Sequence, residues 1–223
     1  MTTATATLSP AAPAATDTAL VRGLLGCGVA AGPLFVGLTV AQAATREGFD
    51  PVVHPLSLLS LGDLGWLQIA NFIVSGLLAL AGAVGLRRAL AGGPASKWGP
   101  RLFGLYGIAL VWGGVFVADP AFGYPIGTPD GAPAEQSWHS ILHAFAAPGA
   151  GLTLLAACFV FARRFRAERR TGWRAACYAV PALYLVLIVT SFAAADFRAM
   201  LAGGALIWLW ASAVTLQQLR THR

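Results

Sequence analysis

The sequence is poor in charge: Asp, Glu, Lys and Arg together make up only 11% of its 223 residues. Soluble domains carry about a quarter, and with a mean hydropathy of +0.68 this composition excludes an ordinary soluble fold. Fifteen basic residues stand against nine acidic ones, a net charge of +6. The basic residues flank apolar stretches, so this charge predicts membrane lipids as partners and no nucleic acid.

Cysteine is also scarce, and a recognisable export signal is absent. Cys27, Cys158 and Cys177 are far apart in sequence, which argues against a disulfide framework and favours a role in packing. Residues 1–18 are rich in Ala, Thr and Pro and have no basic n-region. They predict a disordered N-terminal tail and not a cleavable signal peptide.

What the sequence has in abundance is long apolar runs, each long enough to cross a hydrocarbon layer about 30 Å thick at about 1.5 Å rise per residue. Six can be marked: Ala19 to Ala43, Trp66 to Leu86, Leu102 to Ala118, Trp138 to Ala162, Ala175 to Ala195 and Met200 to Leu216. The predicted fold class is all-α, a polytopic bundle of six transmembrane helices over residues 19–219.

The charges alternate from one connection to the next. Of the basic residues, only Arg46 and Arg198 belong to the first, third and fifth connections, whereas seven of the nine acidic residues lie there. Basic residues mark the cytoplasmic side of a membrane protein. The sequence therefore predicts a multi-pass protein of the plasma (inner) membrane with both termini in the cytoplasm.

The two long outer connections differ from the short inner ones. In the first, Pro55 is expected to begin a short helix whose leucines lie on the bundle. The third, from Asp119 to Ser137, is rich in Pro and Gly and holds no basic residue. Loops of this length are usually functional or disordered.

Polar side chains from several segments are expected at one depth near the outer surface. His139 and His143 are one turn apart and share a helix face, while His54 lies in the first connection and Asp119 ends the third span. Such groups are costly in a membrane and by default mark a functional site. We expect the three histidines to bind a divalent metal such as zinc, with Asp119 as base. The other residues expected to line this outer-facing pocket are Asp50, Asp63, Gln68, Asn71, Ser75 and Asp196.

Structural interpretations of the same residues stay open. The His139–His143 pair lacks the intervening Glu of zinc proteases. His143 can instead donate to a backbone carbonyl or pair with Asp119. Interhelical hydrogen bonding accounts for the amides and hydroxyl of the second span without any catalysis.

Several short strings, in order along nearly the whole chain after the tail, resemble the membrane proteins known as domain of unknown function 998. This resemblance implies a bacterial membrane protein with six spans, and it implies no activity. The strings are Gly48 to Pro51, His54 to Ser57, Gly65 to Gln68, Asn71-Phe72, Asp119-Pro120, Gly123 to Pro125, Gly127 to Pro129, and Trp138-His139 with His143.

A weaker resemblance concerns the site alone. The membrane hydrolases that include alkaline ceramidases and adiponectin receptors use three His, an Asp and a Ser around zinc, and here Ser57 is similar to that Ser. The resemblance implies a catalytic role for Ser57 beside Asp119. The order of residues departs from the pattern, because His54 precedes Ser57 and the histidine pair is on the fourth of six spans.

The sequence thus favours a metal-dependent hydrolase acting on a lipidic or small amphipathic substrate. One alternative is a proton-coupled transporter or a ligand sensor that uses the same His and Asp groups. Another is a membrane subunit whose outer loops dock a partner. The sequence does not distinguish a monomer from an oligomer.

Overall fold

The computed structural model describes residues 15–222, which form eight helices and, apart from one isolated bridge between Ala121 and Tyr124, no β-structure. Most of the predicted tail, residues 1–14, lies outside the described part, and the first helix begins at Ala15 rather than at Ala19. The helices are α1 (Ala15–Thr45), η1 (Leu56–Ser60), α2 (Gly65–Ala89), α3 (Trp98–Val115), α4 (Trp138–His143), α5 (Ala146–Ala167), α6 (Thr171–Ala194) and α7 (Phe197–Thr221).

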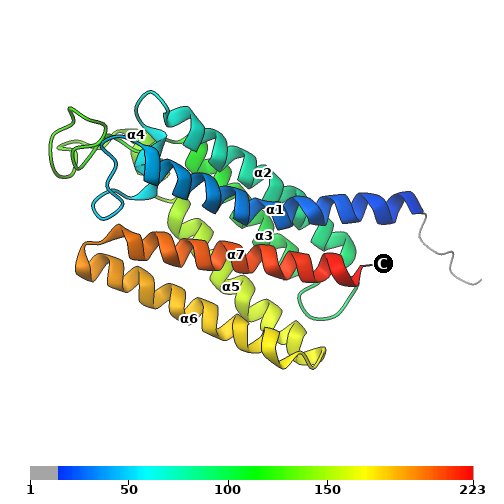
Figure 1. Ribbon diagram of the computed structural model, residues 1–223. Coiled ribbons are helices and arrows are strands. Elements are labelled where there is room, and N and C mark those ends of the chain that lie inside the picture. Colours follow the sequence, from blue (N-terminus) through cyan, green and yellow to red (C-terminus); the bar gives the residue numbers. More distant parts are fainter. Residues whose placement is uncertain (1–14, 223) are drawn as a thin grey trace, which may run out of the picture.

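The six long helices run roughly along one direction (Figure 1), and their contacts close them into a ring. Each packs mainly against the long helices before and after it in the chain, and α7 returns to pack against α1. The long loops gather at one end of the ring, here called the outer end. The α2–α3 connection, the arginine-rich α5–α6 connection and the C-terminus lie at the opposite end, here called the inner end.

Five segments of the described chain are long and apolar enough to cross a membrane: α1, α2, α4 with α5, α6 and α7. The protein is therefore a multi-pass membrane protein with an all-helical fold. The third predicted span corresponds to α3, which is not one of the five because Arg101 and several glycines lower its hydropathy. It is nevertheless part of the ring and packs between α2 and α5.

The fourth predicted span is interrupted. The sequence analysis expected one helix from Trp138 to Ala162, but α4 ends at His143 and α5 begins at Ala146. Pro148 explains the break, because a proline has no N–H to donate to the carbonyl four residues earlier, and its ring crowds that carbonyl. The break sets α4 at an angle to α5 and brings both predicted histidines to the end of α3.

The interior of the ring is filled at the inner end and hollow toward the outer end. At the inner end, four aromatic rings pack with centroids 5.5 to 6.3 Å apart: Phe103, Phe161, Phe165 and Trp210. Toward the outer end the facing residues are small: Ala109, Ala146, Ala150, Gly151 and Gly204. All three cysteines are free thiols, and Cys158 and Cys177 are buried in the core, as their predicted packing role requires.

The outer connections fold onto one another and cover the end of the bundle. Pro55 precedes η1, which confirms the short helix expected there, and its Leu58 and Leu59 are buried. They form a small core with Phe49 and Tyr124. The backbone N–H of Phe197, at the start of α7, donates to the Val52 carbonyl at 2.9 Å. The fifth connection is thereby joined to the first.

Candidate functional site

A cavity of about 500 Å³ occupies the hollow part of the ring. Its walls come from α3, α5, α6 and α7 and from Phe72 of α2, with η1 and α4 at the outer end. Most of the surface is apolar because the wall residues are Ala, Gly, Leu, Ile, Phe, Met and Pro. The larger side chains that shape it are Leu110, Ile188, Phe197, Met200, Ile207 and Trp208.

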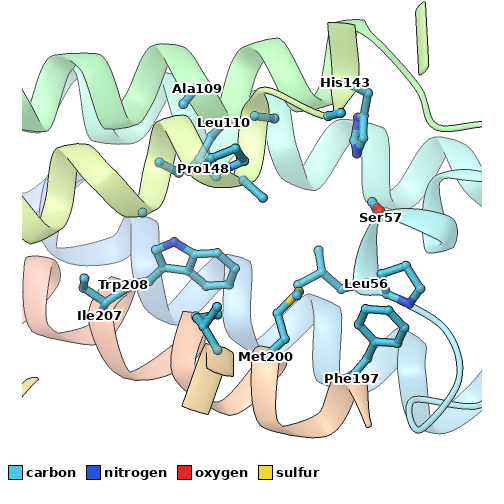
Figure 2. Close-up of a pocket in the computed structure, with 18 of the residues that line it drawn as sticks. Leu56, Ser57, Ala109, Leu110, His143, Pro148, Phe197, Met200, Ile207 and Trp208 are labelled. Carbon is cyan, nitrogen blue, oxygen red and sulfur yellow. The ribbon is translucent and has the colours of Figure 1, made fainter. Parts of the chain in front are cut away.

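Polar groups enter this cavity mainly at its outer end. Ser57 on η1 and His143 at the end of α4 both line it, and Figure 2 shows the two side chains directed toward each other across that end. Deeper in the cavity, Tyr184 contributes a hydroxyl beside Gly151, where only a hydrogen in place of a Cβ leaves room for it. The cavity therefore has a polar end and an apolar body.

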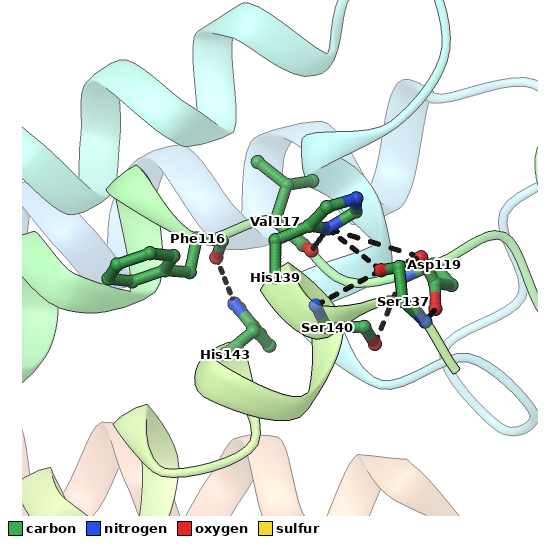
Figure 3. A network of polar contacts seen from close by, with 7 residues as sticks. All are labelled: Phe116, Val117, Asp119, Ser137, His139, Ser140 and His143. Carbon is green, nitrogen blue, oxygen red and sulfur yellow. Dashed lines mark hydrogen bonds and ion pairs between the residues drawn. The ribbon is translucent and has the colours of Figure 1, made fainter.

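A hydrogen bond to the backbone selects the tautomer of the His143 ring. Its Nδ1 lies 2.6 Å from the carbonyl oxygen of Phe116, so Nδ1 is the protonated nitrogen of the neutral ring (Figure 3). The other nitrogen, Nε2, then carries a lone pair. The ring also packs edge-on against Phe72, with centroids 6.4 Å apart. The geometry thus agrees with one structural interpretation, donation to a backbone carbonyl, while Nε2 is left free to accept a proton.

Asp119 and His139 meet beside the cavity and do not line it. The carboxylate of Asp119 accepts hydrogen bonds from Ser137, at 2.7 Å from its N–H and 2.6 Å from its hydroxyl (Figure 3). Nδ1 of His139 lies 4.0 Å from that carboxylate and 2.8 Å from the Val117 carbonyl. Burial raises the pKa of Asp119, but the Ser137 hydrogen bonds and the nearby His139 outweigh it, so its pKa lies below the usual value.

His54 lies apart from the other two histidines, inside the small core of the outer connections. Its Nδ1 accepts from the Asp50 N–H at 2.9 Å, and its Nε2 donates to the Phe122 carbonyl at 2.8 Å. Nδ1 is therefore used within the first outer connection, and Nε2 joins that connection to the third.

The three histidines and Asp119 do not form one metal-binding group. Across residues 15–222, no set of three or more His, Cys, Asp and Glu side chains is close enough to hold an ion. His54 lies apart from the other two histidines, and both of its ring nitrogens already make hydrogen bonds. In this geometry the three side chains do not fit a shared zinc ion, and metal binding stays a prediction.

The other residues expected at the pocket lie elsewhere. Asp50 and Asp63 are exposed. Asp196 caps α7 by accepting from the Arg198 N–H at 2.9 Å, and hydrogen bonds from Arg198 hold its pKa below the usual value.

Gln68, Asn71 and Ser75 are buried between α1 and α2, away from the cavity. Gln42 Nε2 donates to Gln68 Oε1 at 2.7 Å, and Asn71 Nδ2 donates to the Phe35 carbonyl at 3.1 Å. The Ser75 hydroxyl donates to Asn71 at 3.3 Å. Gln68 and Asn71 thus join α2 to α1, which is the structural interpretation that the sequence left open, while Ser75 bonds within α2.

Sequence reasoning missed most of the cavity wall. Tyr184, Ile188 and Phe192 on α6, and Met200 and Trp208 on α7, line it. These residues belong to uniformly apolar spans and have the composition of side chains that face lipid. The small residues on α5 and α7 are the one signal in the sequence, and in a membrane bundle such residues equally indicate close helix packing.

Comparison with known proteins settles the family. The family model described as "Protein of unknown function (DUF998)" matches residues 29–217. The chain belongs to the DUF998 family. No curated protein and no solved structure matches the chain. The resemblance to ceramidase-type hydrolases thus gains no support, and what this DUF998 protein does must be argued from its cavity.

Proposed function

We propose that this protein binds an amphipathic, lipid-like molecule in the cavity, from within the plasma membrane. In this proposal α3 is a sixth span, and both termini lie in the cytoplasm. The support is the charge alternation: the inner end of the ring carries nearly all basic residues, while the outer connections carry most acidic ones.

The observation that carries the proposal is the shape and polarity of the cavity. A volume of about 500 Å³ is within the range of small-molecule sites, roughly 300–1,000 Å³. Its apolar body suits a hydrocarbon chain. At the outer end, His143 Nε2 and the Ser57 hydroxyl can hydrogen-bond a polar head. A molecule with one polar and one apolar end matches both parts.

The cavity opens sideways, between α5 and α6. Four residues of its lining are solvent-exposed, namely Ala144, Ala147 and Pro148 around the α4–α5 break and Phe192 on α6. In Figure 1, α5 and α6 meet at the inner end and diverge toward the outer end. An opening on this face leads into the hydrocarbon layer, so the ligand enters from the bilayer.

Replacing Ala147 by Trp tests the binding site, because the indole would fill the opening. A lysophospholipid carrying a diazirine on its acyl chain is the probe. We expect photocrosslinks to peptides around Met200 and Trp208 in the wild type, reduced by roughly tenfold in Ala147→Trp because the new side chain excludes the probe.

The matched control is Ala156→Trp, which adds the same side chain at an exposed position of α5 outside the cavity. This variant should crosslink like the wild type. Equal crosslinking in all three proteins, or crosslinks confined to lipid-facing peptides of α6, would show that the probe merely dissolves around the protein.

Hydrolysis of an ester in the bound lipid is a second candidate, favoured by the arrangement of Ser57 and His143. His143 Nε2 would take the proton of the Ser57 hydroxyl as its oxygen attacks the ester carbonyl. The alcohol would leave with that proton, and water would then release the acyl group from Ser57. No metal takes part in this version. Transport and partner docking stay predictions of the sequence.

A serine-directed fluorophosphonate with a long alkyl chain tests this second candidate. Labelling is expected in the wild type and should be absent in Ser57→Ala, since no nucleophile remains. Ser60→Ala is the matched control, because Ser60 is on the same short helix but does not line the cavity. Unlabelled wild-type protein that still crosslinks the lysophospholipid would leave binding as the function and rule out a Ser57 nucleophile.

A further inference from the structure

We propose a second binding site at the inner end of the bundle, one that holds the phosphate of an anionic phospholipid. A polar hollow of about 360 Å³ lies between the end of α5, the start of α6 and the end of α7. Unlike the outer cavity, it is lined mainly by charged groups and amides. The residues that matter are Arg164, Glu168, Arg170, Gln217, Gln218 and Thr221.

The two arginines of the hollow differ in how they are held. Arg164 Nε lies 2.7 Å from a Glu168 carboxylate oxygen, and its NH1 donates to the Pro94 carbonyl at 3.5 Å. For Arg170, the backbone N–H is fixed by donation to the Phe165 carbonyl at 2.8 Å. Within residues 15–222, its guanidinium makes no hydrogen bond or ion pair. Arg170 thus places in the hollow a positive charge that no acidic side chain of the described residues pairs with.

The charges of the lining favour an anion with a single negative charge. Two arginines and one glutamate give a net charge of +1 when His222, which also lines the hollow, is counted as neutral, and Glu168 is paired with Arg164. Arg170 is also the residue that precedes the first turn of α6, where free backbone N–H groups and the helix dipole favour negative charge. A phosphate diester carries one charge and accepts several hydrogen bonds, so it matches this lining.

Two glutamine side chains add hydrogen-bond donors to the hollow. Gln218 is only 4% exposed, and together with Gln217 it lines the hollow from the last turns of α7. The Thr221 hydroxyl is already held by the Gln217 and Gln218 carbonyls, which fixes this wall. A guanidinium binds phosphate oxygens through charge-assisted hydrogen bonds, and amide N–H groups beside it can donate to the remaining oxygens.

The position of the hollow favours a lipid as the source of the phosphate. Trp173 stacks on Phe165 beside it, with ring centroids 5.3 Å apart. Tryptophan is enriched where a membrane protein meets the headgroup layer, and basic pockets between helices at that level bind lipid headgroups. A phosphodiester at this depth belongs to a phospholipid whose chains lie along α5 and α7.

The test uses the full-length protein in nanodiscs of phosphatidylcholine with or without phosphatidylglycerol, followed by native mass spectrometry of the retained lipid. Wild-type protein should retain phosphatidylglycerol in preference to phosphatidylcholine. In Arg170→Gln this retention should fall by about tenfold, because the charge-assisted hydrogen bonds are lost. Gln218→Leu gives a second variant that leaves every charge in place and should also reduce retention.

Arg163→Gln and Arg166→Gln are the matched controls, since both arginines are exposed in the same run and neither lines the hollow. They should retain phosphatidylglycerol like the wild type. An equal loss of phosphatidylglycerol in these controls would mean that the lipid is attracted by the arginine run in general. That result would overturn the proposal of a specific site. Displacement of the lipid by millimolar inorganic phosphate would overturn the lipid as the source, and equal retention of both phospholipids would overturn the proposal altogether.

Discussion

Replacing Arg46 by Met is expected to destabilise the folded protein by about 3 kcal/mol, the usual cost of losing charged hydrogen bonds that are partly buried. One guanidinium nitrogen donates to Gln42 Oε1 at 2.7 Å and to the Leu64 carbonyl at 2.9 Å. The other lies 3.3 Å from the carbonyls of Leu59 and Leu61. Met keeps an unbranched apolar side chain like the Arg stem but satisfies none of these acceptors, so η1 loses its attachment to the end of α1.

The measurement is unfolding of the purified protein in mixed detergent micelles with increasing sodium dodecyl sulfate, followed by tryptophan fluorescence. Arg198→Met is the control, because it removes the other outer arginine, whose side chain is 63% exposed and paired only with the neighbouring Asp196. A change within about 0.5 kcal/mol is expected there. Similar losses for both variants would show that the Arg46 contacts with the loop carbonyls contribute nothing specific.

The helical membrane fold could be predicted because hydropathy and charge report directly on the cost of placing side chains in lipid. The break between α4 and α5 could not. Pro148 interrupts one span, yet Pro33 and Pro181 lie inside the continuous helices α1 and α6. Whether a proline breaks a helix in a membrane depends on which neighbouring groups satisfy the freed carbonyls, and that is a property of the packed bundle.

The histidine pair shows a similar limit at the site. The spacing of the pair correctly placed His139 and His143 on one face of a helix. It did not predict which groups that face contacts. The last carbonyls of a helix lack partners within the helix, and here the two imidazoles bond the Phe116 and Val117 carbonyls just after α3. Only knowledge of where α3 ends would have shown that these nitrogens are occupied.

The close approach of α1 and α2 gives the second large effect. A Cβ added at Gly82 would lie 2.5 Å from Gly28 Cα and 3.0 Å from Gly28 N. Because these are backbone atoms, no rotamer change relieves the overlap and the helices must separate. Gly82→Leu is expected to lower the free energy of unfolding by about 3 kcal/mol, measured in the same detergent titration.

Gly37→Leu separates this steric effect from a change in hydrophobicity. Gly37 is also within a long helix, is exposed, and has nothing within 4 Å of where its Cβ would be. Leucine there should change stability by less than about 0.5 kcal/mol. Separation of α1 from α2 would also pull Gln42 away from Gln68, whose amides meet at 2.7 Å across the same interface. Gly82→Leu should therefore reduce the further cost of Gln68→Leu in a double-mutant cycle, whereas strictly additive losses would mean that the two helices do not move apart.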